Sequence, residues 1–494
     1  MLSPGPRRVR VSPVTYVAAV VTVLAWAPFL TQPLTADEAG FLMLGREWGH
    51  GTSLYGNYWV DRPPVLLWLY RLGAHLMPVT TPAGGLTAPG VRLLGVMAAG
   101  AAVVLAGVLA AAVASRLQIE RPGWTIVGAP VLAGALLTTP LFGMPETNGE
   151  VLAVPFVLLG LWAAVRALEA PTGRRTLAWA AGAGAAGMTA MLIKQSLADA
   201  LVFGLVLALL SPQRRRLLAG LAGGAISVLA GALASAAALG TTPAGLWDAV
   251  VVFRIHASAV ISTSASSSTP QRMSHVAQAF VTSGAALVLV ATVVPVLRRV
   301  LRPTPERALP AAAMALVAWE LVGVAAGGSY WMHYLTGLVP GLVLLVALAR
   351  PAGRARHLLA ACLAVTALST TIAWTQLALS APTVSADAQV ETYLRAHAAP
   401  GDGVVVAFGH PNIVAGSGLQ SPYPQLWSLP VRVRDPHLTA FTQVLSGPDA
   451  PRWVVVAGNG VASWGLDATR AQQYLDQHYT DQVRYGGLHV WEHR

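Results

Sequence analysis

Long apolar runs recur between residues 14 and 380 of this chain, and they constrain its fold more than any other feature. Most runs measure about 17 to 25 residues, the length that a helix needs to cross the hydrocarbon core of a bilayer. The chain has 494 residues, 55% of them hydrophobic, and a mean hydropathy of +0.58. A soluble domain could not bury so much apolar surface, so the sequence predicts a polytopic α-helical membrane protein.

About 11 transmembrane helices are predicted, each a mostly apolar stretch between polar connections. They cover residues 14–30, 91–115, 124–140, 150–168, 176–194, 196–210, 217–239, 276–297, 308–327, 335–349 and 357–380. The stretch 64–77 is shorter and carries charge, so it is predicted to be a helix in the membrane interface. The serine-rich segment 240–275 is predicted to be a mobile lid or an unstructured connector.

Arginine gathers in every second connection between these spans. The residues are Arg7, Arg8, Arg10, Arg116, Arg121, Arg166, Arg174, Arg175, Arg214, Arg215, Arg216, Arg298, Arg299, Arg302, Arg307, Arg350, Arg354 and Arg356. Because basic connections mark the cytoplasmic side, this bias predicts a multi-pass plasma-membrane protein with an inner N-terminus and an outer C-terminus. The net charge of +11 is thus dispersed over short connections, which argues against a nucleic-acid partner.

The alternate connections, on the predicted outer side, hold most of the other ionisable residues of the membrane part. These are Asp37, Glu38, Asp61, Arg62, Glu146, Glu150, Lys194, Arg254, His256, His275 and His333. Only 11% of all residues are charged, so this concentration indicates where chemistry would take place. The loop 31–90 carries the densest group.

The character of the sequence changes after residue 384. Segments 402–409 and 451–460 are predicted to be buried strands, and 386–398 and 467–479 to be helices with a polar face. The prediction is therefore a transmembrane domain over residues 1–384 and a small extracytoplasmic α/β domain over residues 385–494. The single cysteine, Cys362, excludes an intrachain disulfide and a cysteine-based metal site.

Two acids, Asp37 and Glu38, follow the first span directly. A carboxylate in this position can take a proton from a hydroxyl or amine that attacks a substrate. The alternative is structural, because an acid here can also cap the helix predicted over residues 39–48, and Asp37 suits that role by position.

Candidate phosphate ligands come from two further places. Arg62 is followed by Pro63 and Pro64, which hold the backbone extended, and its guanidinium can form two hydrogen bonds with a phosphate or contact lipid headgroups. Lys194 is the only lysine of the chain and lies at the outer end of a span. It can neutralise a phosphate, extend to the interface, or pair with Asp199.

The first-loop pattern TADEAGFLMLGREWGHG followed by YWVDRPPVLLWLYRLG resembles that of GT-C glycosyltransferases of the family 39 and aminoarabinose transferase type. Protein O-mannosyltransferases are related to this type. Such proteins show an acid pair after the first span, an acid-Lys-Pro-Pro element, and an Arg that opens the second span. Asp37 with Glu38, the segment 61–64, and Arg92 stand at these places here.

Later segments match in order. MPETNGEVLAVPFVLLG carries Glu150 where the family opens its fourth span with an acid, and GAAGMTAMLIKQSL ends a glycine-rich span in Lys194. GGSYWMHYLTGLVPGL places His333 and Tyr334 before a proline. The chain departs from the family pattern in having Arg62 for Lys, Glu150 for Asp, and Gln195 for Gly.

The resemblance implies a membrane hexosyl- or pentosyltransferase. It would move a sugar from a polyprenyl phosphate to a glycan, lipid or protein acceptor on the outer face, with inversion. In this assignment Asp37 acts as the base with help from Glu38. Arg62, Lys194 and Arg92 would bind the leaving phosphate. Substrate contacts would come from Asp61, Glu150, His333 and Tyr334.

A cofactor and two other functions stay open at this point. The only cofactor expected is a divalent cation between Asp61 and His256, where two outer connections would meet. A secondary transporter would show inverted repeats, and no internal repeat is visible in the sequence. A catalytically inactive scaffold that works through its outer domain is the second alternative.

Overall fold

The computed structural model describes residues 9–119, 123–263, 268–302, 305–380, 383–458, 460–462 and 466–494. Arg7, Arg8 and Arg121, which enter the predicted charge bias, lie outside them. The chain divides into two compact units. The bundle unit comprises Met1–Phe29, Leu94–Ala232 and Ser268–Ser380, and the loop unit comprises Leu30–Leu93, Leu233–Ser267 and Ala381–Arg494.

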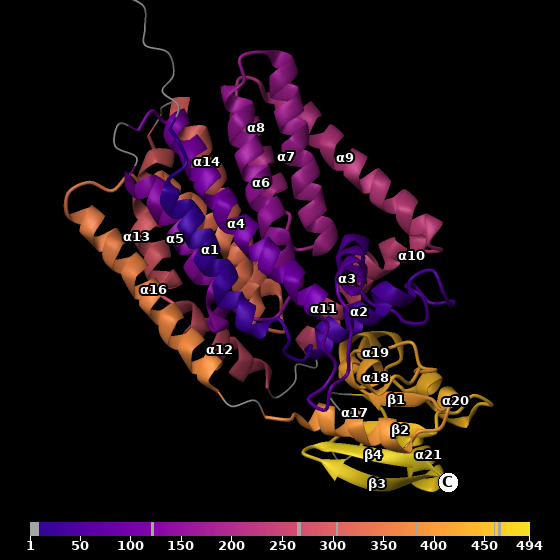
Figure 1. Ribbon diagram of the computed structural model, residues 1–494. Coiled ribbons are helices and arrows are strands. Elements are labelled where there is room, and N and C mark those ends of the chain that lie inside the picture. Colours follow the sequence, from indigo (N-terminus) through magenta and orange to yellow (C-terminus); the bar gives the residue numbers. More distant parts are fainter. Residues whose placement is uncertain are drawn as a thin grey trace, which may run out of the picture. The chain divides into compact units, whose positions relative to one another are not determined.

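The bundle unit consists of helices, most of them long and apolar (Figure 1). They are α1 (Pro13–Trp26), α4 (Pro89–Arg116, from Leu94 on), α5 (Gly123–Thr138), α6 (Gly149–Glu169), α7 (Gly173–Ile193), α8 (Asp199–Leu209), α9 (Arg214–Ala238, to Ala232), α12 (Thr269–Thr282), α13 (Ala285–Val300), α14 (Ala308–Ala326), α15 (Val339–Ala349) and α16 (Arg354–Leu379). Short 3₁₀ turns lie at η1 (Ala27–Phe29), η2 (Pro140–Phe142), η4 (Pro305–Arg307) and η5 (Met332–Leu338). The predicted polytopic helical class is confirmed.

Eight of the described helices are long and apolar enough to cross a membrane, or nine if α12 and α13, bent by 67°, form one span. The shorter apolar helices Pro13–Phe29, α5 and α8 coincide with three further predicted spans. Each predicted span therefore falls on a helix. One helix that passes the same test, Pro243–Thr263, lies in the loop unit at a place where no span was predicted.

Small residues allow neighbouring helices of the bundle to approach closely. A Cβ added at Gly184 of α7 would collide with the backbone oxygen of Leu221 on α9, and one at Gly224 of α9 would collide with Ala181 of α7. Helix packing in lipid depends on such contacts because lipid tails are as apolar as the side chains. The Gly- and Ala-rich composition of these spans thus has a direct structural cause.

The loop unit contains two helices of the first loop and the C-terminal domain. The helices α2 (Ala36–Glu47) and α3 (Pro64–Leu76) pack so closely that a Cβ at Gly45 would lie 2.8 Å from the carbonyl oxygen of Leu67. The C-terminal helices are α17 (Ala386–His397), α18 (Pro411–Ser417), α19 (Ser428–Arg434), α20 (Thr439–Ser446) and α21 (Thr469–His478). Its strands are β1 (Val404–Ala407), β2 (Trp453–Ala457), β3 (Tyr479–Tyr485) and β4 (Leu488–His493).

The four strands form one sheet in the order β1-β2-β4-β3, in which only β1 and β2 run parallel. Val405, Val454 and Phe441 belong to the hydrophobic core of this domain. The predicted small α/β domain is confirmed, with both predicted strands and both predicted helices. The hairpin β3–β4 was not predicted, because Asp481, Arg484 and other polar residues interrupt its apolar pattern.

The segment 243–263 is helical, contrary to the expectation of a lid or unstructured connector. It forms α10 (Pro243–Trp247), the π-helical turn η3 (Asp248–Val252) and α11 (Phe253–Thr263). Phe253 packs on Trp59 with ring centroids 4.7 Å apart, and Leu429 of α19 packs against the same cluster. These contacts tie the segment to the first loop and the polar C-terminal domain. Residues 264–267 of the predicted lid lie outside the described ranges.

Candidate active site

Thr35 is the N-cap of α2, and Glu38 completes the cap. The Thr35 hydroxyl accepts a hydrogen bond from the backbone N–H of Glu38, and the Glu38 carboxylate accepts one from the Thr35 N–H at 2.9 Å. This reciprocal arrangement is a capping box. The structural interpretation of Asp37 as the cap of this helix is therefore wrong.

Glu38 is fully buried and forms an ion pair with Arg92, whose Nη2 lies 2.9 Å from Glu38 Oε2. Arg92 is 2% exposed and also donates to the carbonyl oxygen of Pro33 at 3.0 Å. A buried charge is tolerated when it is paired and hydrogen-bonded in this way. Glu38 and Arg92 thus join the beginning of α2 to the beginning of α4.

Asp37 lies in a different environment although it is the next residue. Its side chain is only half-buried, and its Oδ1 accepts a hydrogen bond of 2.8 Å from Nε1 of Trp427. The Trp427 ring stacks on Phe41 of α2 with centroids 5.6 Å apart and planes inclined by 29°. Of the two adjacent acids, Asp37 is therefore the more accessible one.

Asp61 lies between two arginines. Arg62 Nη1 is 2.9 Å from Asp61 Oδ1, and Arg254 Nη1 is 2.9 Å from Asp61 Oδ2. Burial raises the pKa of Asp61, but the two guanidinium groups outweigh burial and hold the pKa below its ordinary value. The side chains of Arg62 and Arg254 remain 25% and 35% exposed, so both guanidinium groups are partly accessible to a ligand.

Local sequence explains where Arg62 points. Its carbonyl oxygen accepts a hydrogen bond of 2.7 Å from the hydroxyl of Tyr55, which is fully buried. Pro63 follows with φ of −67° and Pro64 opens α3, so the chain directly after the arginine is rigid. The Arg62 guanidinium lies 5.7 Å from the ring centroid of Phe41, on the helix that carries Asp37.

The structure does not support a metal site at Asp61 and His256. Both Asp61 oxygens face arginine, and a divalent cation there would meet two positive charges. His256 lies on the exposed side of α11. Within the described ranges no group of three or more His, Cys, Asp or Glu side chains is placed to hold a metal ion.

A second polar cluster lies in the bundle unit. Lys194 forms an ion pair with Glu150 and lies with its Nζ 4.6 Å from the ring centroid of Tyr334. His333 Nδ1 is 3.3 Å from Glu146 Oε2, and His333 Nε2 is 3.8 Å from Glu150 Oε1. The four residues predicted from the later motifs are therefore neighbours, and Glu146 joins them.

The ends of two helices position this cluster. Asn148 caps α6 by accepting from the backbone N–H of Val151 at 3.0 Å, which places Glu150 in the first turn. Lys194 follows the last turn of α7, and its side chain runs beside Gly149. The suggested pairing of Lys194 with Asp199 is wrong, because Lys194 bonds Glu150.

The predicted site residues thus separate into two groups. Asp37, Glu38, Asp61, Arg62 and Arg92 lie in the loop unit, and Glu150, Lys194, His333 and Tyr334 lie in the bundle unit. Sequence reasoning missed Arg254 and Trp427 as members of the first group. Neither stands in a motif, because each reaches the group from a distant part of the chain.

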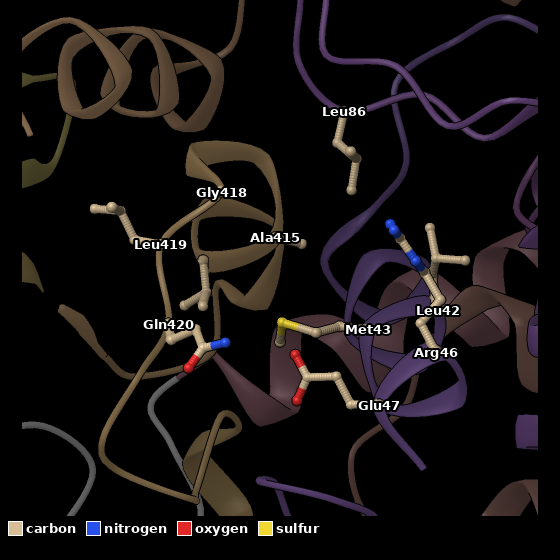
Figure 2. Close-up of a pocket in the computed structure, with 10 residues that line it drawn as sticks. Leu42, Met43, Arg46, Glu47, Leu86, Ala415, Gly418, Leu419 and Gln420 are labelled. Atoms are coloured by element: carbon tan, nitrogen blue, oxygen red, sulfur yellow. The ribbon is translucent and has the colours of Figure 1, made fainter. Parts of the chain in front are cut away.

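A pocket of about 320 Å³ lies in the loop unit between α2 and the region after α18 (Figure 2). Its lining is Leu42, Met43, Arg46, Glu47, Leu86, Val414, Ala415, Gly418, Leu419 and Gln420. Arg46 follows Asp37 at a spacing of about 2.5 helical turns, which puts the two side chains on opposite faces of α2. The pocket therefore does not contain Asp37.

The fold is similar to that of a solved protein structure. A crystal structure of ArnT from Cupriavidus metallidurans bound to undecaprenyl phosphate matches with a TM-score of 0.62 and 15% identity, over 96% of this chain and 97% of that chain. The chain has the GT-C fold. The apo structure of the same protein matches with a TM-score of 0.57 and 15% identity, over 97% of each chain. The likeness extends over both units, including the C-terminal α/β domain.

No protein-family model matches the sequence, and no curated protein sequence is similar to it. At 15% identity the likeness to ArnT is one of fold, and it confirms the fold that the first-loop pattern predicted.

Proposed function

We propose that this protein is an integral membrane glycosyltransferase related to the family 39 and aminoarabinose transferase type. It moves a sugar from a polyprenyl-phosphate donor to an acceptor at the outer face of the plasma membrane. The observation that carries the proposal is the loop unit's combination of a half-buried carboxylate, Asp37, with two partly exposed arginines, Arg62 and Arg254. The fold supports it, because the similar ArnT structure holds undecaprenyl phosphate.

The reaction is a displacement at the anomeric carbon. A hydroxyl or amine of the acceptor attacks that carbon from the side opposite the phosphate, and its proton passes to the Asp37 carboxylate. The bond between the anomeric carbon and the phosphate oxygen breaks, and the electron pair leaves with the lipid phosphate. A single displacement of this kind inverts the configuration of the sugar.

The leaving phosphate needs fixed cations, because negative charge grows on it as the bond breaks. Arg62 and Arg254 supply two planar guanidinium groups, which bind phosphate oxygens through paired hydrogen bonds. Asp61 holds both arginines at 2.9 Å and so positions them before the donor arrives. We assign Asp61 to this positioning role.

Arg92 has a different role from the one that the family pattern suggested. Its guanidinium is buried against Glu38 and the Pro33 carbonyl, whereas a phosphate ligand has to reach the donor. We therefore assign Arg92 and Glu38 to the support of α2, the helix that carries Asp37.

The bundle cluster is proposed, by itself, as a further substrate-binding group. Lys194 would contact an anionic group of the substrate, and Glu150 would bind a sugar hydroxyl. His333 and Tyr334 would contact the substrate beside them. Lys194 is 16% exposed at its side chain, so a ligand can reach it. Because Glu150 already pairs with Lys194, a bound anion has to compete with that carboxylate for the ammonium group.

The two other functions lose support. A secondary transporter is not favoured by a chain whose fold matches ArnT over nearly its full length. An inactive scaffold would not need a half-buried acid beside an exposed pair of arginines, and an activity measurement separates it from an enzyme.

The proposal is tested with the purified full-length protein in lipid nanodiscs. The probe is the organic lipid extract of cells that lack the gene, shown beforehand to contain polyprenyl-phosphate sugars, together with the envelope fraction of the same cells. Mass spectrometry should detect release of free polyprenyl phosphate over time. No release from such an extract would contradict a polyprenyl-phosphate donor.

A further inference from the structure

The C-terminal domain contacts the proposed base through the side chain of Trp427. Trp427 stands directly before α19, and its indole N–H is the group that bonds Asp37 Oδ1 at 2.8 Å. An indole nitrogen can only donate a hydrogen bond. It therefore favours the ionised carboxylate, which is the form that a base requires, and it fixes one of the two oxygens.

The Trp427 ring is held on the helix that carries Asp37. It stacks on Phe41, and a Cβ at Gly40 would collide with the ring and lie 3.0 Å from Pro411. The glycine thus leaves the space that the indole occupies. Such packing restricts the ring to one orientation, so the hydrogen bond to Asp37 is set by the fold.

The backbone around Trp427 is also attached to the first loop. The N–H of Ser421 donates to the hydroxyl of Tyr58 at 3.0 Å, and the N–H of Trp59 donates to the carbonyl oxygen of Pro424 at 3.0 Å. Three contacts therefore connect the segment 421–427 with the loop that carries Asp37 and Arg62.

We infer that Trp427 is a positioning residue for the Asp37 base and that the C-terminal domain thereby forms part of the active site, an inference that rests on the proposed function. The domain is then required for the chemistry itself and not only for stability.

Other ionisable groups of the loop unit also titrate, and their effect on the Trp427 signal has to be distinguished from that of Asp37. Glu38 on α2 is paired with Arg92, and Arg62 lies over the Phe41 ring. His410, directly before α18, has its Nδ1 3.0 Å from Asp387. The substitution Asp37→Asn removes only the carboxylate in question.

The contact is tested without any substrate. Full-length protein labelled with 5-fluorotryptophan in nanodiscs gives fluorine NMR signals for its 15 tryptophans, and the signal lost in Trp427→Phe identifies Trp427. This signal should shift with pH in one step that disappears in Asp37→Asn. A signal that does not titrate, or one whose titration survives Asp37→Asn, overturns the inference.

Transfer activity gives the second readout. Trp427→Phe keeps an aromatic ring on Phe41 but loses the donor, so kcat should fall roughly 10-fold while KM for the donor stays unchanged. The acid limb of the pH profile should move to higher pH, because loss of a hydrogen bond to a carboxylate raises its pKa. Trp247→Phe, at a tryptophan that is 64% exposed, is the matched control.

The outcomes separate the inference from the proposed function. Equal kcat and equal pH profiles for Trp427→Phe and wild type would reject the positioning role and leave the enzyme assignment intact. An inactive wild type would reject the proposed function, whereas the fluorine titration would still report whether Trp427 bonds Asp37.

Discussion

The loop unit and the bundle unit both place acids around cations, but they differ in the balance of charge and in exposure. In the bundle unit the single cation Lys194 faces Glu150 closely, with Glu146 and His333 beside them. In the loop unit Asp61 is shared by two arginines that are 25% and 35% exposed. The loop unit is therefore the better anion site, and the bundle cluster has to give up an ion pair before Lys194 can bind one.

The same contrast appears within the loop unit, between neighbouring residues. Glu38 is fully buried against Arg92, whereas Asp37 is half-buried and bonded to Trp427. Adjacent acids of the same motif thus serve different purposes. Burial, and not residue type, is what distinguishes Glu38, which supports the fold, from Asp37, which is proposed to act as the base.

The largest expected effect comes from Asp37→Asn. Loss of the base should lower kcat by about 10²- to 10⁴-fold. The protein should stay folded, because the amide oxygen of the new asparagine still accepts the hydrogen bond from the Trp427 indole. The measurement is release of polyprenyl phosphate by the purified variant. Glu38→Gln is the informative neighbour, because it should lower the midpoint of thermal unfolding by weakening the pair with Arg92. Comparable turnover in Asp37→Asn and wild type would remove Asp37 from the mechanism.

Lys194→Met tests whether the bundle cluster is only structural. It leaves the buried Glu150 carboxylate without its cation and should cost about 3–5 kcal/mol of stability, measured by chemical unfolding in detergent. The double variant with Glu150→Gln should regain most of that stability. If Lys194 contacts the donor, the double variant stays inactive. A stable and fully active double variant would show that the cluster serves the fold alone.

Arg62→Ala tests whether the partly exposed arginines Arg62 and Arg254 bind the donor phosphate. Loss of charged hydrogen bonds to the phosphate should lower kcat/KM for the donor by about 10- to 100-fold. Arg62→Lys keeps the charge but not the planar guanidinium group that forms paired hydrogen bonds, so kcat/KM should fall less than in Arg62→Ala. Arg254→Ala is expected to act in the same direction. An unchanged donor dependence in Arg62→Ala would exclude the phosphate contact.

The smallest effect concerns Glu391 of α17. Burial, only partly offset by Arg395, raises the pKa of Glu391 from 4.5 to about 7. Protonated Glu391 contributes to the stability of the folded protein. This contribution is complete below the pKa of Glu391 in the unfolded chain and is lost as the pH rises through about 7. Glu391→Gln should therefore raise the unfolding midpoint by a few degrees at pH above about 7 and change it little in acid. Asp449→Asn, at an exposed carboxylate, is the control.

The sequence predicted well what local pattern determines. Apolar runs located the helices. The first-loop motif singled out Asp37, Asp61 and Arg62, which lie in one unit, and their roles stay a prediction. The capping box formed by Thr35 and Glu38 was also readable, since a threonine three residues before an acid is its signature. This signature predicts Thr35, and not Asp37, as the residue that caps α2.

Contacts between distant segments could not be predicted from local pattern. Trp427 and Arg254 reach the first loop only because the loop unit combines three separate stretches of the chain. The segment 243–263 was misjudged for a related reason, because serines concentrated near its end obscured the apolar residues that pack on Trp59.

One measurement tests the central claim most directly. Polyprenyl-phosphate sugars are quantified by mass spectrometry in cells that lack the gene and in the same cells supplied with wild-type protein or Asp37→Asn. One lipid-linked sugar should accumulate in the deletion and equally with Asp37→Asn, and wild-type protein should remove it. No accumulation in the deletion, or its removal by Asp37→Asn, would contradict the account.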